Sequence, residues 1–384
     1  PFYSKMDINQ LGGIHVKNFF IGLILLALMV SVCGCADTGE NFQEVDQETR
    51  EALLAFLEEV ALGGHGQCKI LTDDEVGESS VGTISGSVSG KFTNAEIVSI
   101  SFLDDKILEV NRAEVSPDGK WGPLTMLYGP KALIVVEGDV LLGYRLLDSR
   151  FAAILSSGSS YADFLIDPQD TGIVALALIY SGKAQEAANL LAQLQTIHPT
   201  LSGLPVKVDV FGVSLDNTID YSATAWTGYA AAVLAEASDH PNLWKEATAY
   251  ASYLEAQPLP ADDETRLGGW LLFSQLGDKY PEYAALADEW KLEPGKEYNP
   301  LVGTYILMSG GKLKKYIDQD YVPMSETDKW IHYSLLAAVN KLPAEIDVAV
   351  ENAPGGMAVF EEGKISLQAT GWMMIALQGG LDKD

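Results

Sequence analysis

The chain has 384 residues, of which 47% are hydrophobic and 20% are charged, as is typical of a folded protein of two or three domains. Its formal net charge of −28 argues against nucleic acid and anionic lipid surfaces as partners, because both would be repelled. Neutral sugars, cations and basic proteins are compatible with that charge. The acidic residues form no long run, which indicates solvated faces that serve solubility.

An export signal is predicted near the start of the sequence. Lys17 precedes an apolar run over residues 19–32, which is short for a membrane span and ends in Val32-Cys-Gly-Cys35. This ending resembles the lipobox of bacterial lipoproteins. The resemblance implies lipidation of Cys35, a membrane anchor through that lipid and, because Ala36 follows, an outer-membrane or surface location. An uncleaved anchor helix is the alternative.

Residues 1–35 are therefore predicted to be a leader and a lipoprotein signal peptide. If translation begins at Val16, residues 1–15 are a translation artefact. Removal of Cys33 and lipidation of Cys35 leave Cys68 as the unmodified cysteine. We expect no intramolecular disulfide, no metal site and no cofactor.

Residues 36–80 are predicted to form a tether and one amphipathic helix. The helix covers residues 47–62, because apolar side chains recur there at helical spacing and Gly63-Gly64 ends the pattern. Residues 66–80 are predicted to be a loop.

Residues 81–148 are predicted to form a small antiparallel β-sandwich. Short runs of alternating or apolar residues are separated by turn signals such as Ser116-Pro-Asp-Gly119. Gly86, Val88, Gly90 and Asp118-Gly-Lys-Trp-Gly122 resemble the carboxypeptidase regulatory-like modules with an Ig-type fold. That resemblance implies a spacer or accessory domain.

Residues 149–384 are predicted to be helical hairpins. Trp226, Trp270, Trp330 and Trp372 recur at similar helix positions about 40 to 60 residues apart, which is typical of a repeat architecture. Apolar helices are expected near six starts: Thr171, Tyr221, Arg266, Pro300, Asp328 and Ser366. Amphipathic helices between them would form an outer layer of an all-α (α/α)6 toroid. The sixth outer helix is missing after Trp372, and we predict that the helix over residues 47–62 replaces it.

The helical part resembles the six-hairpin glycosidase-like superfamily. The resemblance is carried by Asp170-Thr-Gly-Ile-Val-Ala-Leu-Ala-Leu-Ile179, Gly182-Lys-Ala-Gln-Glu-Ala187, Thr224-Ala-Trp226 and Trp372. It implies glycoside hydrolases, glycan lyases and epimerases, together with members that have no such activity. Gly355-Gly-Met357 and Ala369-Thr-Gly-Trp372 also resemble terpene-cyclase and prenyltransferase toroids, but no acidic donor motif and no zinc ligand set accompany them.

Site residues are expected at the rim where the inner helices start. Inverting hydrolysis needs two carboxyl groups roughly 6.5 to 9.5 Å apart, and the candidate catalytic residues are Asp170, Asp220 and Glu264. The expected substrate-binding residues are Trp226, Arg266, Trp270, Trp330, His332, Gln368 and Trp372. Further rim candidates are Asp216, Asn217, Asn299 and Asp328.

Each of these candidates also has a structural interpretation. Aspartates before helices are preferred N-caps, and tryptophans on apolar helix faces belong to cores. Arg266 could pair with Glu264, and His332 could be a buried histidine with satisfied hydrogen bonds.

Two functions are thus predicted in parallel. The first is a surface lipoprotein that binds, and hydrolyses, an extracellular or cell-wall polysaccharide. The alternative is a non-catalytic scaffold that assembles with envelope proteins or a filament, and a terpene-cyclase-like or prenyltransferase-like toroid ranks third. Ordered carboxylates at an open groove would favour the enzyme, whereas a funnel filled by side chains would favour the scaffold.

Overall fold

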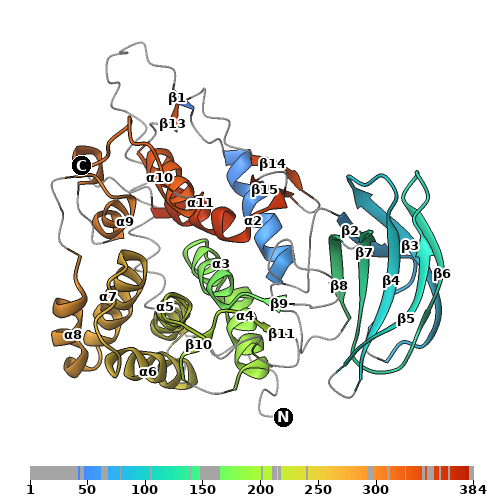
Figure 1. Ribbon diagram of the computed structural model, residues 1–384, viewed down its shortest axis with the longest axis horizontal. Helices are drawn as coiled ribbons and strands as arrows, with labels where there is room; N and C mark the ends of the chain where they lie inside the picture. The colour runs from blue at the N-terminus through green and yellow to red at the C-terminus, as the bar shows by residue number, and fades with distance from the viewer. Residues whose placement is uncertain are drawn as a thin grey trace.

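The computed structural model in Figure 1 contains a β-sheet region followed by a helix-rich region. The described residues are 42–43, 47–61, 68–147 without 78, 104–105 and 139, 165–199, 202–209, 214, 218–238, 241–292, 297–308, 312–324, 326–339, 342–343, 350–353, 356–361 and 364–379. The predicted leader, signal peptide and Cys35 lie outside them. Within them, no helix has the length and hydrophobicity needed to span a membrane.

Two antiparallel sheets form the β-region, in the strand orders β2-β3-β6 and β5-β4-β7-β8. The strands are β2 (Cys68–Thr72), β3 (Gly82–Gly90), β4 (Glu96–Leu103), β5 (Lys106–Glu114), β6 (Lys120–Met126), β7 (Lys131–Glu137) and β8 (Val140–Leu146). The predicted antiparallel β-domain is confirmed. Strand β2 lies in the segment predicted to be a loop, where it pairs with β3 and buries Cys68 and Ile70.

The central strands β4 and β7 are apolar on both faces. On β7, Leu133 and Val135 pack in the core between the two sheets. Their neighbours Ala132, Ile134 and Val136 belong instead to the core that includes the helical region. The central strands of the four-stranded sheet are therefore buried on both sides, and one face of the sheet belongs to the core that includes the helices.

Ten α-helices are described: α2 (Gln47–Ala61), α3 (Pro168–Tyr180), α4 (Ala184–Ile197), α5 (Tyr221–Ser238), α6 (Pro241–Glu255), α7 (Asp263–Gly277), α8 (Ala284–Trp290), α9 (Pro300–Met308), α10 (Glu326–Ala338) and α11 (Leu367–Gly379). Two short 3₁₀ helices accompany them, η3 (Pro281–Tyr283) and η4 (Leu313–Lys315). Short strands also occur among the helices: β1 (Phe42–Gln43), β9 (Leu165–Ile166), β10 (Leu204–Pro205), β11 (Val208–Asp209), β12 (Ile219–Asp220), β13 (Leu342–Pro343), β14 (Val350–Ala353), β15 (Gly356–Glu361) and β16 (Lys364–Ile365).

The six predicted apolar helices are present as α3, α5, α7, α9, α10 and α11. Each contacts the next in this order, and α11 contacts α3 (Figure 1). Helix α4 packs on α3, α6 on α5, and α8 on α7. Apolar residues cover most faces of α3 and α5, whereas α4 and α6 bury one face each. The described helices thus form an inner set and a partial outer set.

Helix α2 packs against the side of the helical region that faces the β-region (Figure 1). It contacts α11, α3, α4 and β15, and Lys183, the residue before α4, forms an ion pair with Glu58 of α2. Leu53, Phe56 and Leu57 are fully buried in the core that contains α3 and α11. Helix α2 therefore packs on the helical region and not only on the β-domain. Its role as the sixth outer helix stays a prediction.

Candidate functional site

The start of helix α3 is fixed by an aspartate that sequence reasoning missed. Asp167 is the N-cap, and its Oδ1 accepts hydrogen bonds from the backbone N–H groups of Gln169 at 2.9 Å and Asp170 at 3.4 Å. Pro168 occupies the first turn, where its missing N–H costs nothing. An Asp-Pro pair directly before an apolar helix was the available signal. Asp170 itself lies one turn further on and is half-buried.

Helices α5 and α7 begin with similar caps. Asp220 accepts a hydrogen bond at 2.9 Å from the Ala223 N–H of α5. Asp262 accepts one at 2.7 Å from the Thr265 N–H of α7. Because Asp262 caps α7, the Glu264 side chain does not serve as the cap. It accepts a hydrogen bond at 2.6 Å from Nε2 of Gln169 in α3. The starts of α3 and α7 are therefore joined.

We call Asp167, Asp220 and Glu264 the acid cluster. Burial raises the pKa of Glu264 to about 7; the Gln169 hydrogen bond opposes this, and the carboxylates of Asp220 and Asp262 add to it. Burial also raises the pKa of Asp167, against two backbone hydrogen bonds and Lys207, while Asp220 pushes it further up. Near neutral pH Glu264 is therefore protonated in part of the molecules, as a general acid must be.

The polar contacts continue from α7 to α9. Nδ2 of Asn299 donates to Oδ2 of Asp263 at 2.7 Å. Its Oδ1 accepts from the Leu301 N–H at 2.9 Å, so this side chain also caps α9. The N-terminal ends of α3, α7 and α9 therefore lie at one rim. Asp220, at the start of α5, lies close enough to raise the pKa values of Glu264 and Asp167.

A second group, the Tyr–His cluster, lies beside Asn299. The Tyr298 hydroxyl is 2.9 Å from Nδ1 of His332, and the Tyr321 hydroxyl donates to Oδ2 of Asp328 at 2.7 Å. His332 is 1% exposed, and burial lowers its pKa although Asp328 and Asp318 oppose the shift. The imidazole is thus neutral at pH 7. His332 is therefore a buried histidine whose Nδ1 has a hydrogen-bond partner.

The other predicted site residues fall in several places. Nη2 of Arg266 donates to the Lys291 carbonyl at 2.9 Å, which ties α7 to the end of α8. Asp328 accepts from the Met324 N–H at 2.8 Å and so orders the segment before α10. Gln368 is half-buried in the first turn of α11. Asp216 and Asn217 lie outside the described residues.

Three of the four repeated tryptophans are core residues. Trp226, Trp330 and Trp372 are at most 2% exposed, and Trp226 meets Trp372 edge to face at 5.0 Å. Trp270 is half-buried, with its ring 4.1 Å from that of Tyr305. Of the predicted sugar platforms, Trp270 is the one with exposed surface. Sugar binding by any of them stays a prediction.

The interior between the helices is closely packed. A crevice between α9, α10 and α11 is lined by Thr304, Ser334 and Trp372 among others, and has a volume of about 10 Å³. A single water needs roughly 10 to 15 Å³. This crevice therefore has no room for a sugar ring.

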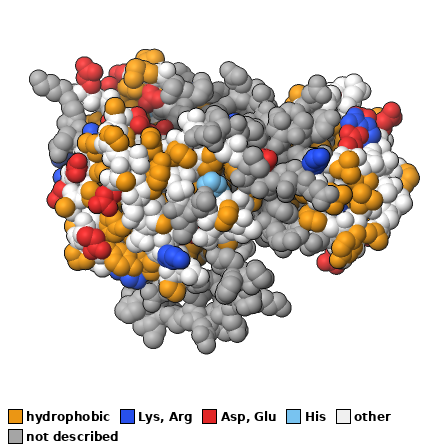
Figure 2. Space-filling model, turned by 60° about the horizontal axis from the view of Figure 1, so that its bottom comes forward, with side chains coloured by type: hydrophobic (Ala, Val, Ile, Leu, Met, Phe, Trp, Pro, Cys, Tyr) orange, Lys and Arg blue, Asp and Glu red, His pale blue; other side chains and the backbone are white. Residues whose placement is uncertain are grey.

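Two further kinds of site, a metal centre and a reactive cysteine, have no support among the described residues. In the part of the chain that the structure describes, no cluster of three or more His, Cys, Asp or Glu side chains could hold a metal ion. Burial raises the pKa of the Cys68 thiol to about 12, which makes it a poor nucleophile. On the face drawn in Figure 2, acidic side chains lie in several separate places.

Neither protein-family models nor curated proteins match this chain.

Proposed function

We propose that the helical region is an (α/α)6 toroid whose rim binds a polysaccharide and hydrolyses its glycosidic bonds. The ring order of six inner helices supports the toroid, because α11 contacts α3 and so returns the series to its start. Helix α2 occupies the place of the sixth outer helix beside α11 and α3. The β-domain is an accessory module, and Cys35 carries a lipid that holds the protein at the bacterial outer membrane or cell surface.

The acid cluster is the observation that carries this proposal. With a pKa of about 7, Glu264 keeps its proton in part of the molecules near neutral pH and can deliver it to the glycosidic oxygen. Asp220 then removes a proton from the attacking water. The bond between the anomeric carbon and the leaving oxygen breaks as the water oxygen attacks the opposite face, which inverts the anomeric configuration.

Reducing-end release, combined with binding to a glycan array, tests the catalytic proposal. We expect Glu264→Gln to lower release by about 10²- to 10⁴-fold, because Gln cannot donate the proton. Asp220→Asn should also lose activity while it keeps the α5 cap, since Asn caps as well as Asp. Glu282→Gln, on an exposed part of η3, is the matched control. Equal release by parent and Glu264→Gln would refute the assignment of the acid.

A non-catalytic scaffold is the second candidate, and the filled interior favours it. Trp226, Trp330 and Trp372 occupy the space that a deep substrate funnel would need. In that case the rim is an interaction surface for an envelope protein. Binding without release would indicate a carbohydrate-binding toroid, and neither binding nor release would select the scaffold.

A further inference from the structure

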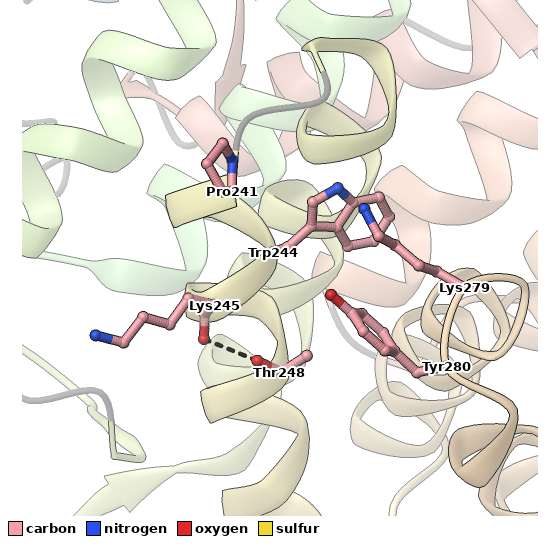
Figure 3. Close-up of a pocket in the computed structure, with 6 residues that line it drawn as sticks. All are labelled: Pro241, Trp244, Lys245, Thr248, Lys279 and Tyr280. Carbon is pink, nitrogen blue, oxygen red and sulfur yellow. Dashed lines mark hydrogen bonds between the residues drawn. The ribbon is translucent and has the colours of Figure 1, made fainter.

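A groove on the outer layer has no part in the proposed catalysis. Its volume is about 510 Å³, and it lies between α6 and the residues that follow α7 (Figure 3). The lining residues are Pro241, Trp244, Lys245, Thr248, Lys279 and Tyr280. Helix α7 has 15 residues, so this groove, at its C-terminal end, is about 20 Å from the acid cluster at its start.

Two aromatic rings form a corner in this groove. The rings of Trp244 and Tyr280 meet edge to face at 6.1 Å and 81°. Nζ of Lys279 lies 4.2 Å from the centre of the Trp244 ring, and Figure 3 shows its side chain beside the indole. This contact holds an ammonium group at the corner, where a cation and an apolar surface are presented together.

Two of the six lining residues of the groove are lysines, and none is an acid. Asp278 and Glu282 lie close to Lys279 and Tyr280 in the sequence. The Lys245 side chain points away from the aromatic pair (Figure 3). The Thr248 hydroxyl donates to the Lys245 carbonyl at 3.0 Å, so its oxygen can still accept from a ligand hydroxyl. An anion is therefore favoured near Lys279, with hydroxyl partners around it.

We propose that this groove binds a carboxylate-bearing saccharide, with the carboxylate at Lys279 and a sugar ring against Trp244 and Tyr280. A sugar ring has an apolar face with hydroxyl groups at its edge, and the groove offers aromatic surface with polar groups beside it. Its volume is within the range of small-ligand sites, roughly 300 to 1,000 Å³. The site is distinct from the acid cluster, where carboxylates would repel the same ligand.

Calorimetric titration of the purified full-length protein with trigalacturonate tests this proposal. We expect Lys279→Gln to weaken binding by about tenfold, because a charge-assisted hydrogen bond is lost. Lys245→Gln should weaken it less, Lys279→Arg should retain it, and Lys120→Gln on exposed β6 should leave it unchanged. The methyl ester of trigalacturonate, which has the same rings without the charge, should bind more weakly than the acid.

Three outcomes would overturn the proposal. These are no binding of trigalacturonate, equal binding by the parent and Lys279→Gln, and binding of inorganic phosphate as tight as that of trigalacturonate. The last would show an anion site that ignores the sugar ring. Glu264→Gln separates the two sites, since it should lower release at the rim by about 10²- to 10⁴-fold and leave this titration unchanged.

Discussion

Glu246 of α6 is a buried carboxyl group with a large effect on stability. It is 2% exposed, and burial raises its pKa to about 8, although the nearby Tyr250 side chain opposes the shift. In the unfolded chain the pKa of Glu246 has its ordinary value, near 4.5. Since the folded protein binds the proton more tightly, this residue costs stability as the pH rises from about 4.5 to 8.

We therefore expect Glu246→Gln to be more stable than the parent at alkaline pH. The advantage should grow by up to about 1.4 kcal/mol per pH unit between pH 5 and pH 8, because the variant has no proton to lose. Urea unfolding at pH 5, 7 and 9 measures it, with Glu282→Gln as the control. A difference that is the same at all three pH values would contradict this account.

At the residue scale, the sequence indicated which acids lie at helix starts but not the protonation state or the burial of the side chains. Asp220 and Glu264 were predicted because they precede apolar helices, and the structure places both at one rim. Asp167 was missed, since Asp170 was nearer the apolar pattern. Whether a tryptophan is a platform or a core residue depends on which neighbouring helices cover it, and a single sequence does not contain that information.

At the element scale, helix α2 depends on a close approach to the β15 strand. A Cβ atom added to Gly356 would overlap the backbone carbonyl oxygen of Ala52 in α2. We expect Gly356→Ala to lower the free energy of unfolding by about 1 to 3 kcal/mol, because backbone atoms must move apart. Gly77→Ala is the control, since nothing lies within 4 Å of the added atom there.

Chemical denaturation measures the free energies of both variants. If α2 were loosely attached, Gly356→Ala and Gly77→Ala would behave alike. Hydrogen exchange in residues 47–61 gives a second measurement, and we expect faster exchange there in Gly356→Ala.

The predicted elements differ in how well a sequence pattern defines them. The helices and the antiparallel strands were predicted because their apolar residues recur with one clear period. Strand β2 and the strands β14, β15 and β16 between α10 and α11 were not, because short segments carry too few residues to show a period. Their pairing is decided by the sheet or helix they meet.

At the scale of the whole molecule, one strand separates two cores. Leu133 and Ile134 are adjacent on β7 and fully buried, but Leu133 faces the sandwich core and Ile134 the core shared with the helices. Truncation to Ala at either position should lower the free energy of unfolding by about 2 to 5 kcal/mol. We expect Ile134→Ala to speed hydrogen exchange in both regions, and Leu133→Ala chiefly in the β-sandwich.

Equal effects of the two substitutions on the helices would contradict this separation.

The domain order, a β-region followed by helices, was predictable from the change of period along the chain. The shared core was not, because a strand that is apolar on both faces does not reveal which domain covers its second face.

The position of α2 also constrains how the protein is made. Helix α2 is synthesised before the β-region, whereas α11, which it contacts, is synthesised after every other described helix. During that interval Leu53, Phe56, Leu57 and Val60 lack their final neighbours and present an apolar stripe to the surroundings. We therefore expect a nascent chain stopped before α11 to bind chaperones through α2 and to aggregate in their absence. Once α11 has been synthesised and packs on α2, the tendency to aggregate should fall.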